Sequence, residues 1–205
     1  MKNKNLFMVQ FALLVAIEAI FSFTPLGSLP AIGPIVATLF MIPVIITSIL
    51  LGTKAGTLMG LFAGIFSFIV WTFTPPSPVA FIFTPFYTLG EIQGNFGSLL
   101  ICFVPRILVG TVSGLVYTSF SKIFPKKDVL NMVVASLLGS FTNTVGVMGG
   151  IWLFFGQQYS SMVGQSMLAI VGLTVLTSGI PEAIVAAVAS SAVCKPTKLI
   201  INKSR

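Results

Sequence analysis

"VLNMVVASLLGSFTNTVGVMGGIWLFF", residues 129–155, decides the fold of this chain, because it carries no charged side chain over a length that can cross a bilayer. A transmembrane helix needs about 20 apolar residues. Charge-free stretches also run from Ala19 to Thr53 and from Ala55 to Gly90, and the quoted one continues to Pro181. These runs are continuous rather than alternating, which indicates helices instead of barrel strands. The sequence therefore predicts an all-α integral membrane protein.

The composition excludes most soluble and enzymatic classes. Only 7% of the residues are charged and 56% are hydrophobic, whereas a soluble domain has about 25% charged residues. The chain has no His, and its two cysteines, Cys102 and Cys194, lie far apart, so both are interpreted as inert apolar residues. Neither a G-x-x-x-x-G-K-[ST] loop nor an H-E-x-x-H pair occurs. We expect no enzyme, no metal site and no cofactor.

Six helices in one domain, residues 1–205, account for the apolar runs. The expected spans are approximately residues 6–23, 33–51, 55–73, 96–121, 129–155 and 163–193, separated by segments rich in Pro and Gly. The N-terminal run resembles a signal peptide, but no A-x-A-like cleavage site followed by polar sequence is present. We therefore expect it to be retained as the first helix.

The basic residues set the expected orientation. With six spans, every Lys and Arg except Arg106 falls on one side of the membrane. The positive-inside rule then places both termini in the cytoplasm. This distribution explains the net charge of +7 as topology and requires no nucleic-acid partner.

Four polar residues are expected to share one layer inside the bundle. Glu18, Arg106, Asn143 and Glu182 each lie about 20–24 Å from the nearest charged residue at the cytoplasmic end, at about 1.5 Å per helical residue. A charge at this depth costs at least about 2.5–3.5 kcal/mol, so it should be paired or functional. Arg106 either forms an ion pair with Glu18 or Glu182, or binds an anionic ligand, for which its planar guanidinium is suited.

The linker after the third span, "TFTPPSPVAFIFTPFYTLGE" (residues 72–91), is aromatic and carries no charge before its final Glu91. We expect it to fold over the outer mouth as a lid whose rings, with Trp71, cover a small ligand. Interfacial anchoring of the aromatic side chains is the alternative. Small residues repeat every four positions at Gly56, Gly60 and Gly64 and at Gly110 and Gly114, which predicts close helix packing.

Several motifs, taken in order, resemble the substrate-binding S components of energy-coupling factor (ECF) vitamin transporters over residues 8–193. They are "IPVIITSILLGTKAGTLMGLFAGIFSF" (42–68), "FTPF" (83–86), "FVPRILVGTVSGLVY" (103–117), "GSFTNTV" (139–145) and "GIPEAIVAA" (179–187). The resemblance implies a multi-pass protein of the bacterial plasma membrane that captures one vitamin from outside. It also implies partners, a transmembrane coupling (T) subunit and two ATPase (A) subunits, with Ala12 and Ala16 as the docking motif.

The resemblance is strongest to carriers of pantothenate, our first choice, and of hydroxymethylpyrimidine or pyridoxine. One Arg together with Asn and Thr groups suits the single carboxylate and the hydroxyls of pantothenate. A self-contained, proton-coupled secondary transporter is the alternative from another class. The candidate substrate-binding residues are Arg106, Asn143, Thr142, Glu182, Trp71, Phe81, Tyr87 and Asn95.

Overall fold

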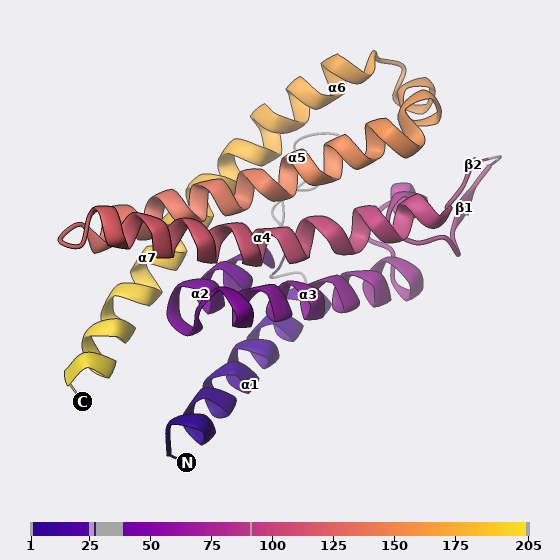
Figure 1. The fold of residues 1–205 in the computed structure, drawn as a ribbon. Coiled ribbons are helices and arrows are strands. Elements are labelled where there is room, and N and C mark those ends of the chain that lie inside the picture. Colours follow the sequence, from indigo (N-terminus) through magenta and orange to yellow (C-terminus); the bar gives the residue numbers. More distant parts are fainter. Residues whose placement is uncertain (1, 25–26, 28–38, 91, 204–205) are drawn as a thin grey trace.

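The computed structural model describes residues 2–24, 27, 39–90 and 92–203, and this part of the chain is almost entirely helical. Its main helices are α1 (Lys2–Phe23), α2 (Met41–Leu51), α3 (Thr53–Phe73), α4 (Phe96–Ile123), α5 (Asp128–Val163), α6 (Met167–Thr174) and α7 (Ile180–Lys203) (Figure 1). A 3-10 helix, η2 (Pro78–Ile82), and a small antiparallel hairpin of β1 (Thr88–Leu89) and β2 (Ile92–Gln93) connect α3 to α4. The all-α prediction is confirmed.

Five helical segments of the described chain are long and apolar enough to cross a membrane: Lys4–Phe23, Thr53–Phe73, Phe96–Ile123, Asp128–Val163 and Met167–Ile200. The second predicted span, residues 33–51, appears only as the 11-residue α2, and residues 33–38 lie outside the described part. Since α2 is buried from Met41 to Ile49, it is an interior helix enclosed by its neighbours.

The predicted boundary after the fifth span is wrong, because "GQQYSSM" (156–162) is helical and not a linker. α5 continues for 36 residues to Val163 and ends where Gly164 adopts the left-handed conformation, with φ of 71°. Gly readily adopts this conformation and commonly terminates helices. The quoted segment holds no proline, and its Gly156 does not adopt a positive φ, so α5 extends to Gly164.

The last span is a single helical path with a local irregularity. A π-helical turn, η3 (Val175–Gly179), joins α6 to α7 immediately before Pro181. Proline has no N–H and its ring clashes with the carbonyl four residues earlier in a regular α-helix. The π turn ends two residues before this proline, and the helical path continues through Pro181 to Lys203, beyond the predicted end at residue 193.

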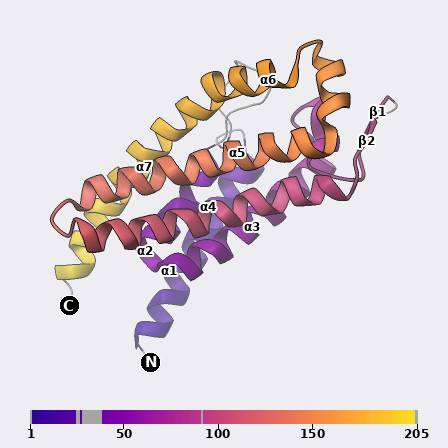
Figure 2. The ribbon, with the colours of Figure 1, turned by 45° about the horizontal axis from the view of Figure 1, so that its top comes forward.

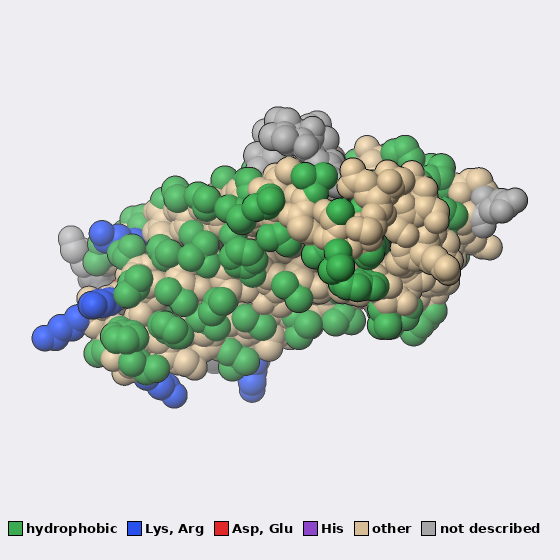
Figure 3. All heavy atoms as spheres, turned by 90° about the horizontal axis from the view of Figure 1, so that it is seen from above, with side chains coloured by type: hydrophobic (Ala, Val, Ile, Leu, Met, Phe, Trp, Pro, Cys, Tyr) green, Lys and Arg blue, Asp and Glu red, His purple; other side chains and the backbone are tan. Residues whose placement is uncertain are grey.

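The helices form an elongated bundle, with both chain ends and the α4–α5 turn at one end and the β1–β2 hairpin at the other (Figures 1 and 2). Lys and Arg side chains gather toward the first end, while hydrophobic side chains are spread over the face shown in Figure 3. This distribution agrees with the grouping of lysines that the sequence predicts.

Glycines bring α3 and α4 into close contact, as predicted. A Cβ added to Gly60 would lie 2.2 Å from the backbone oxygen of Arg106, and one added to Gly110 would lie 2.0 Å from that of Gly56. The Ser48 hydroxyl of α2 also donates to the Gly110 carbonyl at 2.8 Å. The small residues therefore fix the height of Arg106 relative to α3.

Candidate functional site

Arg106 lies inside the bundle, and only 3% of its surface is exposed. The preceding Pro105 cannot donate the helical hydrogen bond that the Ile101 carbonyl would otherwise accept. The Arg106 guanidinium occupies that acceptor, since its Nη1 donates to the Ile101 oxygen at 2.8 Å. The Pro-Arg pair thus uses a backbone defect to orient a buried cation.

Two aromatic rings flank the guanidinium. Its Cζ lies 5.1 Å from the ring centre of Phe83, in the α3–α4 linker, and 5.6 Å from that of Phe40, just before α2. Phe83 in turn stacks on Trp71, with 4.6 Å between the ring centroids. The linker predicted as a lid therefore rests directly on the predicted anion-binding residue.

These contacts contribute substantially to holding the cation inside the bundle. A hydrogen bond to a charged group contributes about 1.5–3 kcal/mol, and a cation–π contact contributes about 0.5–2 kcal/mol. Together they match the cost of at least about 2.5–3.5 kcal/mol for a charge at membrane depth. The Nε of Arg106 still has no hydrogen-bond partner among the described residues, so the guanidinium retains capacity to bind an anion.

α5 and α7 bring the other predicted polar residues to this level. A Cβ on Gly146 of α5 would lie 3.0 Å from the Pro105 ring, and one on Gly179 would lie 3.1 Å from Thr144. Asn143 comes directly before Thr144 along α5, and 7% of it is exposed. Within the described chain its Oδ1 accepts no hydrogen bond.

Glu182 and Glu18, the carboxyls of the predicted layer, are both buried, and 5% and 0% of their surfaces are exposed. Glu182 attracts the Arg106 guanidinium electrostatically. Glu18 instead accepts a hydrogen bond from Ser22 at 3.3 Å, and the ion pairs of the described residues do not join it to Arg106. Of the two predicted carboxylate partners, Glu182 is therefore the one that acts on Arg106.

The middle of the lid segment, residues 80–84, is folded into the bundle, while residues at both of its ends are exposed. Ala80, Phe81, Ile82 and Thr84 are fully buried. The Phe81 ring packs edge-on against Phe155 with centroids 5.5 Å apart. The Ser98 hydroxyl donates to the Phe81 carbonyl at 2.6 Å. These contacts attach the lid to the start of α4 and to α5.

The remaining predicted site residues lie farther from this arrangement or have structural roles. Tyr87 is partly buried against the same apolar cluster as the lid. Asn95 is exposed and caps α4, where its Oδ1 accepts from the Gly97 N–H at 2.7 Å. Thr142 donates to the Leu138 carbonyl of its own helix at 2.7 Å. Their roles in ligand binding stay predictions.

Sequence reasoning missed Phe40 as a contact of Arg106. It sits at the start of the short helix α2, in an uninterrupted apolar run that gives no reason to single it out. Only the packing of α2 against α4 brings its ring to the guanidinium. Phe83, by contrast, belonged to the predicted lid, although its contact with Arg106 was not foreseen.

The fold and site define a multi-pass membrane protein with a buried cation beneath a closed aromatic segment. The chain belongs to the ECF transporter substrate-specific components, whose family model matches residues 6–193. It is 37% identical over 161 residues to the pantothenic acid transporter PanT of Lactococcus lactis subsp. cremoris (strain MG1363), covering 78% of this chain and 76% of that protein. The family is a transporter's substrate-binding component and not an enzyme.

Two solved structures share the fold. The crystal structure of the S component for biotin from an ECF-type ABC transporter aligns with a TM-score of 0.59 at 15% identity, over 96% of this chain and 93% of that one. ThiT from Listeria monocytogenes aligns with a TM-score of 0.50 at 19% identity, over 90% and 94%. At this level of identity the structures support the architecture alone.

Proposed function

We propose that this S component binds pantothenate from outside the cell and delivers it inward as part of an ATP-driven importer. The relative named for pantothenic acid supports this choice of vitamin. The observation that carries the proposal is the buried Arg106 guanidinium, held in place by Ile101 and with its Nε unpartnered in the described chain. A carboxylate placed there would form charge-assisted hydrogen bonds in a low-dielectric interior.

The lid gives a physical reason for tight capture. Phe83 covers the guanidinium on one side, so an entering carboxylate displaces the ring or binds beside it. Trp71 and Phe83 then close over the ligand. Asn143 of α5 offers its Oδ1 as an acceptor for a hydroxyl group or the amide of pantothenate. Glu182 of α7 is proposed as a further contact of the ligand.

The proposed topology has six spans with both termini in the cytoplasm of a bacterial cell. The clustering of lysines at the end that carries both termini supports this orientation (Figure 3).

The partners are a T subunit and two A subunits. Ala12 and Ala16, both exposed on α1, form the docking face. Glu18 points from the opposite face of α1 into the bundle, because it lies about 200° around the helix from Ala16 at about 3.6 residues per turn.

A ligand screen of the purified chain tests the proposal. Isothermal calorimetry and thermal-shift measurements with a panel of B vitamins should show binding of pantothenate and little response to hydroxymethylpyrimidine or pyridoxine, which lack a carboxylate. A clear preference for either of those two would assign another vitamin to the site. Accumulation of substrate by the lone chain in liposomes under a proton gradient would instead support a secondary transporter.

A further inference from the structure

A second polar site lies away from the buried Arg106, at the end of the bundle that carries both termini. It is a pocket of about 350 Å³ between the start of α5 and the C-terminal part of α7, lined by Lys126, Lys127, Lys195 and Lys198. The vitamin site makes no use of these residues. Their convergence on one pocket needs a separate explanation, because like charges repel one another.

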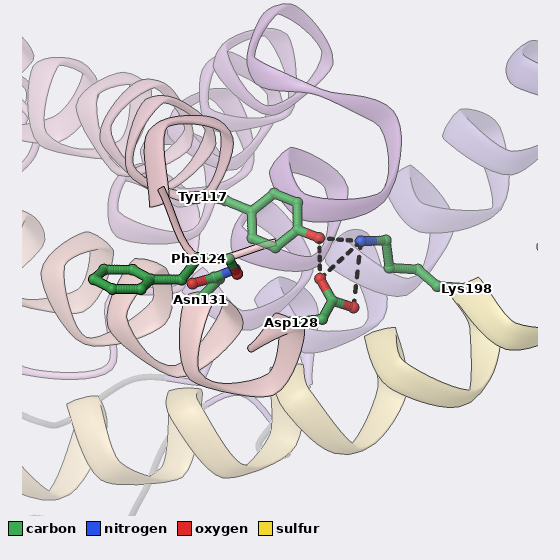
Figure 4. Close-up of polar contacts among 5 residues, drawn as sticks. All are labelled: Tyr117, Phe124, Asp128, Asn131 and Lys198. Carbon is green, nitrogen blue, oxygen red and sulfur yellow. Dashed lines mark hydrogen bonds and ion pairs between the residues drawn. The ribbon is translucent and has the colours of Figure 1, made fainter. Parts of the chain in front are cut away.

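Asp128 is the acidic residue lining this pocket, and it is already neutralised (Figure 4). Lys198 Nζ lies 3.2 Å from its Oδ1 and 3.5 Å from its Oδ2. The Tyr117 hydroxyl donates to the same Oδ1 at 2.5 Å, and Lys198 also contacts that hydroxyl. The charges of Lys198 and Asp128 therefore cancel, and the charges of the other three lysines remain.

Those three lysines are available to an anion. Lys126, Lys127 and Lys195 are exposed, and the ion pairs found in the described residues include none of them. In addition, no side chain caps the start of α5. The first backbone N–H groups of a helix carry a partial positive charge and favour anions. Side chains and backbone thus present positive charge to the same pocket.

The rest of the lining is apolar. Val129, Leu130 and Leu199 line the pocket and are 40%, 45% and 57% exposed. Along α7, Val193 and Ile200 are 45% and 69% exposed. A free phosphate cannot bind favourably to apolar side chains. A phospholipid can place its headgroup on the lysines and its acyl chain along these apolar side chains. Basic pockets between membrane helices at the cytoplasmic surface recognise anionic headgroups in this way.

We propose that this pocket binds one anionic phospholipid, with its phosphate on Lys126, Lys127 and Lys195. Lys198 serves as a positioning residue, because it holds Asp128 away from the headgroup. In the proposed topology the lipid belongs to the cytoplasmic leaflet. The site is independent of the identity of the vitamin, since no residue of the vitamin site lines it.

Native mass spectrometry of the purified full chain tests this assignment, with phosphatidylglycerol and phosphatidylcholine of identical acyl chains as probes. The wild-type chain should bind phosphatidylglycerol at least about tenfold more tightly, since each lysine near a headgroup contributes roughly fivefold. The triple variant Lys126→Gln, Lys127→Gln, Lys195→Gln should lose this preference. The single variant Lys195→Gln should lose roughly fivefold.

The matched control is Lys4→Gln, Lys54→Gln, Lys122→Gln, which removes the same charge from exposed lysines outside the pocket. It should retain the lipid preference. Equal losses in both triple variants, or no preference in the wild-type chain, would overturn the proposal in favour of diffuse attraction. Displacement of the lipid by millimolar glycerol phosphate or inorganic phosphate would assign the pocket to a soluble anion instead.

Discussion

At the residue scale, Pro105 and Arg106 work as a pair. The proline frees the Ile101 carbonyl, and the arginine beside it uses that carbonyl as an anchor. An anchored guanidinium loses less conformational entropy when it binds a ligand than a free one does. In the proposed site the cation is therefore oriented before a ligand arrives.

The substitution Pro105→Ala tests this pairing. An alanine at this position can donate its own N–H to Ile101, so the guanidinium loses its exclusive acceptor and becomes less ordered. We expect pantothenate to bind several-fold more weakly, while the melting temperature stays equal or rises because the helix regains a hydrogen bond. Calorimetry and a thermal melt measure both quantities. Binding as tight as in the wild-type chain would show that the anchor does not matter.

The depth of the polar residues could be predicted from the sequence, but their contacts could not. Counting residues from the lysines placed Glu18, Arg106 and Glu182 well inside the membrane, and all are buried. Which carboxyl acts on Arg106 depends on the rotation of α1 and α7 within the bundle. The contact with Phe40 depends on tertiary packing between segments that are far apart in the chain.

At the element scale, the glycines of α3 and α4 set the height at which the site is presented. Gly60→Ala places a methyl group 2.2 Å from the Arg106 backbone oxygen, and such overpacking costs about 1–3 kcal/mol. We expect a lower melting temperature and weaker pantothenate binding. The control Gly149→Ala, where an added Cβ meets nothing within 4 Å, should be neutral or stabilising. Similar melting temperatures for the two variants would contradict this packing.

The lid can be followed through Trp71, which stacks on Phe83. The chain has two tryptophans, so Trp152→Phe leaves Trp71 as the sole tryptophan, whose emission can be excited selectively. Pantothenate should change the emission of Trp71, because ligand entry should shift the Phe83 ring, which contacts both Trp71 and Arg106. The reciprocal variant, Trp71→Phe, should show no change. An unchanged signal in Trp152→Phe at saturating ligand would mean that the lid does not respond to binding.

The helices could be predicted more accurately than their ends. Apolar runs define α3 and α4 within a few residues. The predicted end of α5 is too early, because the polar residues 156–162 suggest a linker but continue the helix. The predicted end of α7 at residue 193 is also too early, because "CKPTKL" (194–199) is helical despite its proline. Pro196 lies inside α7 and Pro105 inside α4, so proline alone does not mark a boundary in this chain.

At the scale of the whole molecule, our proposal assigns the two faces of α1 to different tasks, with docking on the outward face and the vitamin site inside the bundle. Its outward face is exposed, with Val9 at 66% and Leu13 at 62%, and it carries Ala12 and Ala16. A bulky side chain there should block contact with the T subunit and leave the vitamin site unchanged. Ala12→Trp and Ala16→Trp should bind pantothenate normally and abolish uptake by the assembled transporter.

The control for this experiment is Leu153→Trp, at a position of α5 that is 76% exposed. It should support normal uptake, because it adds the same ring to a surface away from α1. Cells that lack their own pantothenate uptake report the difference directly. Normal uptake by the α1 variants would place the docking surface on another helix.

The central claim is that Arg106 binds the carboxylate of pantothenate, and one set of titrations tests it. Calorimetry should compare pantothenate with its alcohol analogue, in which CH2OH replaces the carboxylate, on the wild-type chain and on Arg106→Ala. We predict that the wild-type chain prefers pantothenate by at least about tenfold, equivalent to about 1.4 kcal/mol, and that the variant binds both ligands equally weakly. An undiminished preference for the carboxylate in Arg106→Ala would contradict the account.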